Sequence, residues 1–162
     1  MLAGGGSAGG HLAACTAVVG KYDETTENQR ISSVPNGLAL FNPALVLAPI
    51  RGADPLDAER MAGLAERMGV APAELSPYHQ LRRGLPPTII FHGQADSTVP
   101  FETAEQYATK ARQLGNPCKL IGYPGQGHGF FNHSRGAKGR YEQTLEALDS
   151  FLVSIKYLPP KR

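Results

Sequence analysis

Residues 1–15 read MLAGGGSAGGHLAAC and place one serine, Ser7, among five glycines within the first ten residues. Four interpretations are open for such a stretch: a flexible Gly/Ser linker, a phosphate-binding loop, a bacterial secretion signal, or a sharp turn that exposes a nucleophilic serine. Each interpretation requires different neighbouring residues, so the sequence that follows decides between them.

The residues after the glycines favour the sharp turn. Apolar side chains recur between residues 8 and 20 at steps of three and four, which predicts a helix with one buried face. That face would consist of Ala8, His11, Leu12, Cys15, Val18 and Val19. A flexible linker would not lead directly into such a helix. The glycine cluster therefore opens a folded element.

The two other interpretations fail on charge and hydrophobicity. A phosphate-binding P-loop requires a lysine directly after its glycines, whereas the first basic residue here is Lys21. The segment Leu12–Cys15 resembles the cleavage box of a bacterial lipoprotein, but it lacks the positive start and the continuous apolar segment of a signal. Without a signal, a cytoplasmic location is the default expectation.

Composition predicts one globular domain spanning residues 1–162. The chain is 41% hydrophobic, enough to bury a core, and its formal net charge of only +2 argues against a nucleic-acid partner. The two cysteines, Cys15 and Cys118, share no metal-ligand spacing. The most apolar stretch, Gly37–Ile50, is interrupted by Asn42-Pro43 and is too short to span a membrane.

Alternating strand and helix patterns follow the first helix. Strands are predicted at 38–41, 88–93 and 118–123, and helices at 101–114 and 141–155. A further helix is predicted to begin at the cap Asp54-Pro55 and to end at Gly69. The predicted core positions of these helices are Met61, Leu64, Ala65, Met68, Ala104, Tyr107, Ala108, Ala111, Tyr141, Leu145, Leu148, Leu152 and Ile155. The pattern predicts an α/β fold: a small parallel sheet of three to four strands with helices on both faces.

Residues 5–9, GGSAG, match the pattern G-x-S-x-G of a strand–turn–helix nucleophile elbow. Gly5 and Gly9 are expected to be required because a side chain would collide across so tight a turn. The helix start at Ala8 would direct its backbone N–H toward an oxyanion. Of the strand before the turn, only Met1–Ala3 are expected to be present.

An activated serine needs a base and a group that orients that base, and parallel sheets gather functional residues at their carboxyl ends. Asp96 follows the 88–93 strand, and His128 follows the 118–123 strand. The order Ser, Asp, His is the order that the elbow architecture uses. A metal site from Asp96, His128 and His133 is compatible with residue type, but the spacing is not diagnostic, and no metal is predicted.

Several segments together resemble the C-terminal part of an α/β-hydrolase, in the esterase/lipase branch that includes acetyl esterases and prolyl-oligopeptidase-like enzymes. They are GGGSAGGHLAA, ALFNPAL, SPYHQL, PPTIIFHGQADSTVPFETAEQ and GQGHGFFNH. The resemblance implies that Ser7 is the nucleophile, Asp96 the orienting acid and His128 the general base. It implies hydrolysis of carboxylic esters, with short acyl groups expected, and no cofactor.

The chain differs from that family in the segment before the elbow, where family members carry well over a hundred residues. Those residues build the first strands and an oxyanion loop of the HGGG type. The resemblance therefore leaves two functional hypotheses, an active esterase and a non-catalytic remnant that keeps the triad without an intact oxyanion hole. A peptidase of the same fold is a third. An open sheet edge would also favour a homo-oligomer in which a second copy covers the exposed surface.

Overall fold

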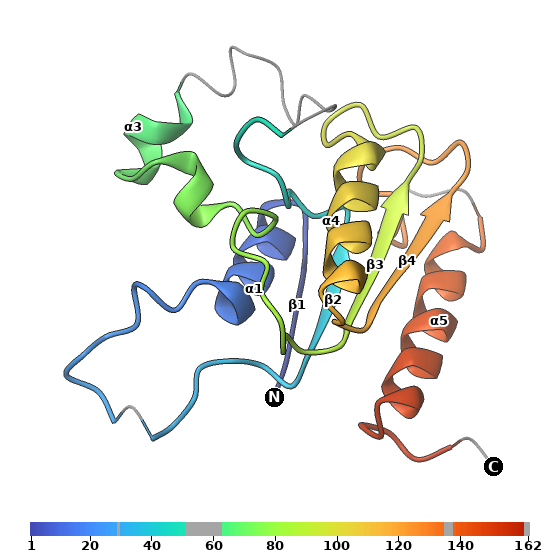
Figure 1. The fold of residues 1–162 in the computed structure, drawn as a ribbon. Coiled ribbons are helices and arrows are strands. Elements are labelled where there is room, and N and C mark those ends of the chain that lie inside the picture. The colour runs from blue at the N-terminus through green and yellow to red at the C-terminus, as the bar shows by residue number, and fades with distance from the viewer. Residues whose placement is uncertain (29, 51–62, 135–137, 161–162) are drawn as a thin grey trace.

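The computed structural model describes residues 1–28, 30–50, 63–134 and 138–160, and shows helices around a parallel sheet (Figure 1). In chain order the elements are β1 (Leu2–Gly6), α1 (Ala8–Val18), β2 (Gly37–Phe41), α3 (Leu64–Met68), the 3-10 turn η1 (Pro72–Leu75), β3 (Thr88–Gly93), α4 (Phe101–Gln113), β4 (Cys118–Tyr123) and α5 (Arg140–Ser154). The predicted α/β class is confirmed.

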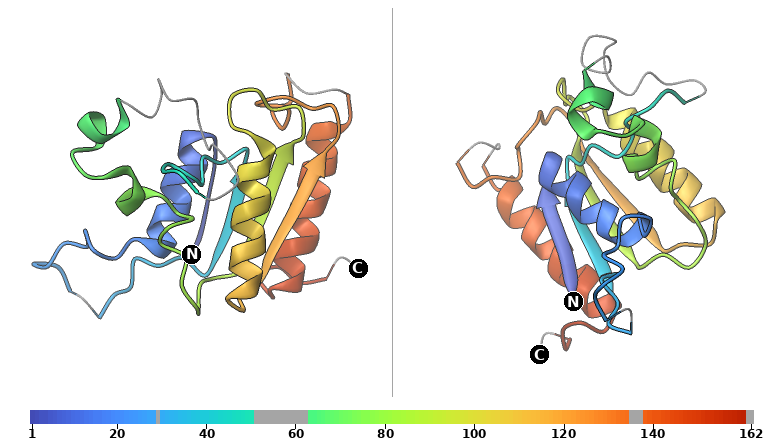
Figure 2. Two further views of the ribbon diagram at one scale, coloured as in Figure 1. Left: turned by 45° about the horizontal axis from the view of Figure 1, so that its top comes forward. Right: turned by 90° about the vertical axis from the view of Figure 1, so that its left-hand side faces the viewer.

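The four strands described form one sheet in the order β1-β2-β3-β4, and all neighbours pair in parallel. Each strand therefore pairs with the next strand along the chain. The helices cover both faces: α1 and α4 lie on one side and α5 on the other, as the right-hand view of Figure 2 shows. Because the strands are parallel, their carboxyl ends meet at one edge of the sheet, at the top of Figure 1.

Two apolar clusters form the core, one on each face of the sheet. The larger packs α1 and α4 against inward side chains such as Leu38, Leu40 and Ile90. The smaller packs α5 against Ala39, Ile89 and Phe91. The β-branched run of β3 fits this position because all six of its residues are buried, as expected of a central strand covered on both faces.

The strand before Ser7 is longer than the sequence predicts. It extends through Gly6 rather than ending at Ala3, and its glycines Gly4–Gly6 pair in register with Ala39–Phe41 of β2. Glycine has little intrinsic preference for strands, so the sequence pattern gave no signal. Close approach explains the glycines: a Cβ on Gly4 would lie 2.9 Å from the Ala39 carbonyl oxygen.

The predicted buried face of α1 is right at Val18 and wrong at Ala8 and Leu12, which are exposed. Its buried residues are Gly10, Ala13, Ala14, Ala17 and Val18, whereas Leu12 is 65% exposed. Small side chains face the sheet because they let the helix backbone approach the strands closely. The hydrophobic period therefore identified the helix but placed Leu12 on the wrong side.

Two further expectations about packing are corrected. No residue of α3 is buried, so Leu64, Ala65 and Met68 do not form a core stripe; the helix start at Asp54 and the side chain of Met61 lie outside the described residues. In α5, Leu145 is 43% exposed while Phe151 is buried. By contrast, the predicted face of α4, which includes Ala104 and Tyr107, is buried.

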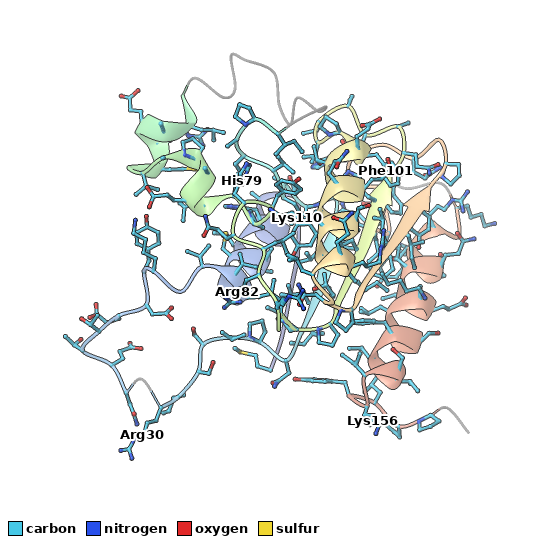
Figure 3. All side chains as sticks on the ribbon, in the orientation of Figure 1. Arg30, His79, Arg82, Phe101, Lys110 and Lys156 are labelled. Atoms are coloured by element: carbon cyan, nitrogen blue, oxygen red, sulfur yellow. The ribbon has the colours of Figure 1, made fainter. Side chains whose placement is uncertain are left out.

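A segment between η1 and β3 ties α1 to α4. Arg82 donates a hydrogen bond to the Ala17 carbonyl of α1 at 3.4 Å, and Lys110 of α4 donates to the Tyr78 carbonyl at 2.9 Å (Figure 3). The Lys110 ammonium also lies over the Tyr78 ring. Within the described ranges, no helix is both long enough and apolar enough to cross a bilayer.

Candidate active site

Ser7 occupies the turn between β1 and α1 in a backbone conformation that side-chain-bearing residues rarely adopt. Its φ is 54° and its ψ is −121°, and it stands at the N-cap position without making a side-chain capping bond. Such strain is typical of functional turns and persists only where the surroundings fix it. The Ser7 hydroxyl therefore lies at the start of α1 but does not cap the helix.

The glycines on either side of Ser7 have different roles. A Cβ on Gly5 would lie 2.5 Å from the carbonyl carbon of Gly9, so β1 and the first turn of α1 touch backbone to backbone. A Cβ on Gly9 would meet no atom within 4 Å. The expectation that both flanking glycines are needed to avoid a collision is therefore right for Gly5 and wrong for Gly9.

Contacts from β2 and from the loop after β4 fix the position of the Ser7 turn. The Ser7 amide donates a 2.8 Å hydrogen bond to the Phe41 carbonyl at the end of β2. The Phe131 ring lies against Gly6, where a Cβ would come within 2.6 Å of it, and also packs on Phe41. The loop that carries His128 therefore reaches the turn that carries Ser7.

Asp96 lies in the turn after β3 with its side chain fully buried. Its Oδ1 accepts hydrogen bonds from the amides of Thr98 at 2.8 Å and Val99 at 3.0 Å. Its Oδ2 accepts from His128 and from the side-chain amide of Asn42. Burial by itself raises the pKa of Asp96, but these hydrogen bonds outweigh burial and hold the pKa below its ordinary value of 3.8.

The loop after β4 is joined to the Asp96 turn by backbone contacts. The Ala95 amide donates to the Gln126 carbonyl at 2.9 Å, and the Gln94 amide donates to Tyr123 at 3.0 Å. Gly93 makes this possible, because a Cβ there would overlap the Gln126 carbonyl. His128 is thereby brought beside Asp96 from a different strand.

The Nδ1 atom of His128 lies 2.8 Å from Oδ2 of Asp96. Because an ionised carboxylate only accepts hydrogen bonds, Nδ1 carries the proton and donates it. In the neutral ring Nε2 is then unprotonated and able to accept a proton. The His128 side chain is 26% exposed, so the ring connects a buried acid to the surface.

His92 packs beneath the same carboxylate. It is fully buried, its Nε2 donates to the Val99 carbonyl at 2.9 Å and lies 3.4 Å from Oδ2 of Asp96, and burial lowers its pKa. The ring is therefore neutral at physiological pH. Its Nδ1 has no hydrogen-bond partner in the described part of the molecule.

Asn42 is the site residue that sequence reasoning missed. It follows β2 directly, is fully buried, and donates from its side-chain amide to Asp96. The available signal was its place: a polar residue immediately after a buried parallel strand, at the sheet edge where functional groups gather. The Asn42-Pro43 pair interrupts an apolar stretch and lies within the segment ALFNPAL, but neither observation assigns a role to Asn42.

The structure thus brings Asp96 and His128 into direct contact and places Ser7 on the same sheet edge. Among the side-chain hydrogen bonds of the described residues, none joins Ser7 to His128. Ala8 begins α1, whose first-turn N–H groups lack partners within the helix.

His11, Cys15 and His79 make contacts outside the site. His11 contacts the Leu75 carbonyl at 2.8 Å and the Cys15 sulfur at 3.3 Å, and burial raises the pKa of Cys15 to about 11. His79 contacts the buried Ser76 hydroxyl. No group of three metal-ligating side chains lies close together in the described ranges.

Comparison with known families identifies the chain. The model of the prolyl oligopeptidase family matches residues 58–152. The chain belongs to this family. Two esterases also match: the probable isoprenylcysteine alpha-carbonyl methylesterase of Arabidopsis thaliana, 28% identical over 145 residues, and an esterase of Mycobacterium tuberculosis, 33% identical over 60 residues. The plant match covers 76% of this chain and 29% of the relative, and the bacterial match covers 35% and 14%.

This member of the prolyl oligopeptidase family is similar, over almost its whole length, to solved structures of esterase 2 from Thermogutta terrifontis. The apo form is 50% identical with a TM-score of 0.86 and covers 99% of this chain and 57% of its own. The propionate-bound form is 49% identical with a TM-score of 0.87 and covers 99% and 58%. The chain therefore spans little more than half the length of these esterases. The predicted resemblance to the esterase branch of the α/β-hydrolases is confirmed.

Proposed function

We propose that this protein hydrolyses carboxylic esters with short acyl groups through a triad of Ser7, His128 and Asp96. The observation that carries the proposal is the 2.8 Å hydrogen bond from Nδ1 of His128 to a buried, ionised Asp96, at the sheet edge where Ser7 occupies a strained turn. Nucleophilic ester hydrolysis needs an imidazole that an acid orients and that can take the proton of a serine hydroxyl.

The chemistry assigns one role to each group. Ser7 Oγ attacks the ester carbonyl while Nε2 of His128 takes the hydroxyl proton, and Asp96 stabilises the imidazolium that forms. The Ala8 backbone N–H stabilises the oxyanion. His128 then protonates the leaving alcohol, and water activated by the same ring releases the acid from Ser7. No step requires a cofactor.

The hydroxyl of Ser7 has to reach His128 for this reaction. Catalytic hydrogen bonds are often long before substrate binds, so the absence of that bond is compatible with the role. The turn is well placed because Ser7 is bonded to Phe41, and the neighbouring Asn42 is bonded to Asp96. The Phe131 contact with Gly6 joins the His128 loop to the same turn.

The short acyl preference is supported by the similar structures. Esterase 2 of Thermogutta terrifontis has been solved with propionate bound and with butyrate bound. The same enzyme has been solved phosphorylated by paraoxon, a reagent that modifies activated nucleophiles. Because the present chain spans little more than half of that protein, its own activity needs a direct test.

The test compares p-nitrophenyl acetate hydrolysis by the parent, Ser7→Ala and Ser150→Ala. Ser150 is the matched control, because it is an exposed serine on α5 whose hydroxyl donates a hydrogen bond to the Glu146 carbonyl. We expect Ser7→Ala to lower kcat by about 10⁴-fold and Ser150→Ala to leave it unchanged. Hydrolysis of p-nitrophenyl octanoate should be slower than that of the acetate and butyrate esters.

Mass spectrometry after paraoxon treatment provides a second readout. A diethyl phosphate adduct on Ser7 that disappears in His128→Gln would support the triad. Equal ester hydrolysis by the parent and Ser7→Ala would refute it. A folded parent with neither turnover nor labelling would support the alternative of a non-catalytic protein, and cleavage of a chromogenic peptide in place of esters would support a peptidase.

A further inference from the structure

Asn42 joins two parts of the proposed site that come from different strands. Its side-chain amide donates a hydrogen bond to Oδ2 of Asp96, while the carbonyl of the preceding residue, Phe41, accepts the Ser7 amide. We propose that Asn42 is a positioning residue that holds the Asp96 carboxylate on His128 and fixes it relative to the Ser7 turn. The inference rests on the proposed function for its kinetic consequences, but its structural content can be measured independently.

The backbone at Asn42 is shaped for this contact. Its φ is 44°, in the left-handed region that asparagine tolerates better than other side-chain-bearing residues. Its amide nitrogen donates to the Phe91 carbonyl at 2.8 Å, which keeps the residue in line with β3. The side chain is therefore directed from β2 across the end of β3 to the turn that carries Asp96.

The carboxylate has two differently held oxygens. Oδ1 is bonded by the amides of Thr98 and Val99, which belong to the same turn as Asp96. Oδ2 is bonded by Asn42 and His128, which come from elsewhere in the sheet. The second pair ties the carboxylate directly to side chains from other parts of the site.

His92 gives Oδ2 an alternative partner. Its Nε2 lies 3.4 Å from that oxygen, compared with 2.8 Å for Nδ1 of His128. Without the Asn42 amide, rotation of the carboxylate toward His92 would lengthen the bond to His128. Asn42 therefore selects the partner that the proposed reaction uses.

The other end of the Asn42 amide shows that this arrangement has a cost. Its Oδ1 is buried and has no hydrogen-bond partner among the described residues. An unpaired buried acceptor is unfavourable. Rotating the amide would not relieve it, because the oxygen would then face the Asp96 carboxylate. The position thus favours the contact with Asp96 over full hydrogen bonding of the side chain.

The experiment compares Asn42→Gly with Asn116→Ala. Glycine suits the left-handed backbone at residue 42, so the first variant removes the amide with little backbone strain. Asn116 is the matched control, because it is also buried and bonds to Leu85 and Arg82 near the opposite end of the sheet. Both variants lose a buried asparagine, but only one loses a contact to Asp96.

We expect Asn42→Gly to lower kcat for p-nitrophenyl acetate about tenfold while KM changes less than about twofold. We also expect the downfield proton resonance of His128 Nδ1–H, assigned by its loss in His128→Gln, to shift or broaden. Asn116→Ala should lower the melting temperature without changing kcat or this resonance. A folded Asn42→Gly that keeps the parent's kcat and resonance would overturn the proposal.

Asn42→Asp provides a second test that does not depend on Asn42→Gly folding. The titratable side chains that face Asp96 are His92 and His128, and the substitution adds a carboxyl group beside them. When protonated, the new carboxyl can donate to Oδ2; when ionised, it repels Asp96. The kcat of Asn42→Asp relative to the parent should therefore fall from mildly acidic to mildly alkaline pH, and a constant ratio would contradict the positioning role.

Failure of this inference can be distinguished from failure of the proposed function. If the parent has no Ser7-dependent esterase activity, the proposed function is wrong, and the His128 resonance alone decides the role of Asn42. If the parent is active and Asn42→Gly retains both the rate and the resonance, the function stands and the positioning role is wrong.

Discussion

The two lateral ends of the sheet, β1 with α1 at one and β3 with β4 at the other, differ in how the sheet packs against the helices. At β1, glycines bring the strand, the turn and the helix into backbone contact, as the close approach of Gly5 to Gly9 shows. At β3, large β-branched and aromatic side chains such as Ile90 and Phe91 fill the space between sheet and helices. The β1 end therefore packs through close backbone contacts, and the β3–β4 end packs through bulky side chains.

The largest effect is expected where volume is removed from the β3 end. Ile90→Ala deletes a fully buried side chain in the core between the sheet, α1 and α4, and should lower the free energy of unfolding by about 4 kcal/mol. Leu12→Ala is the control on α1: it removes an exposed leucine and should change stability by less than about 0.5 kcal/mol. Urea denaturation measures both. A large loss in Leu12→Ala would contradict the buried face described for α1.

At the β1 end, adding volume should destabilise. In Gly5→Ala the new Cβ meets the backbone of Gly9, which cannot rotate away, so we expect a loss of about 3 kcal/mol. Gly9→Ala points into open space within α1 and should stabilise by up to about 1 kcal/mol through helix propensity. Thermal melts of the pair compare the two glycines directly. Equal destabilisation by both would show that the turn is crowded on both sides.

A smaller, pH-dependent effect is expected at the junction of the two ends. Because the folded pKa of Asp96 is lowered, its ionised form stabilises the protein at pH above its ordinary value of 3.8. That contribution is lost as the pH falls from this value through the lower folded pKa. The difference in Tm between the parent and Asp96→Asn should therefore be largest near neutral pH and shrink on acidification below 3.8. A difference that grows toward acid would have the wrong sign.

The weakest effect concerns the two edges of the described sheet. The β4 edge carries the exposed Lys119, a charge of the kind that discourages edge pairing, whereas β1 has no charged residue. We propose that a second copy of the chain associates along β1. Light scattering should report more than a monomer at micromolar concentration, and Ala3→Lys should reduce association. A monodisperse monomer would rule this out.

The contrast between the two ends also explains what could be predicted from the sequence. The bounds of β3 and β4 and the buried face of α4 follow from side-chain patterns, and the structure confirms them. The extension of β1 through Gly6 and the buried face of α1 do not follow, because glycine and alanine pack through their backbone and leave no hydrophobic pattern. Hydrophobic periodicity detects elements that pack through large side chains and misses those that pack through glycine and alanine.

The same limit applies to the site. Asp96 and His128 were predicted from their places after strands, and the structure joins them. Asn42 was not predicted, because its contact depends on a left-handed backbone conformation and on the register of β2 against β3. Neither the backbone conformation nor the strand register can be inferred from the residue type alone.

The place of α5 after the four described strands in chain order has a consequence for folding during synthesis. Because each strand pairs with the next along the chain, the sheet can assemble progressively as the polypeptide leaves the ribosome. The face that bears Ile89 and Phe91, however, receives Phe151 and Leu152 only when α5 emerges. Until then the nascent chain exposes an apolar face of the sheet. Premature termination before residue 140 would leave that surface uncovered, and the product would be prone to aggregate.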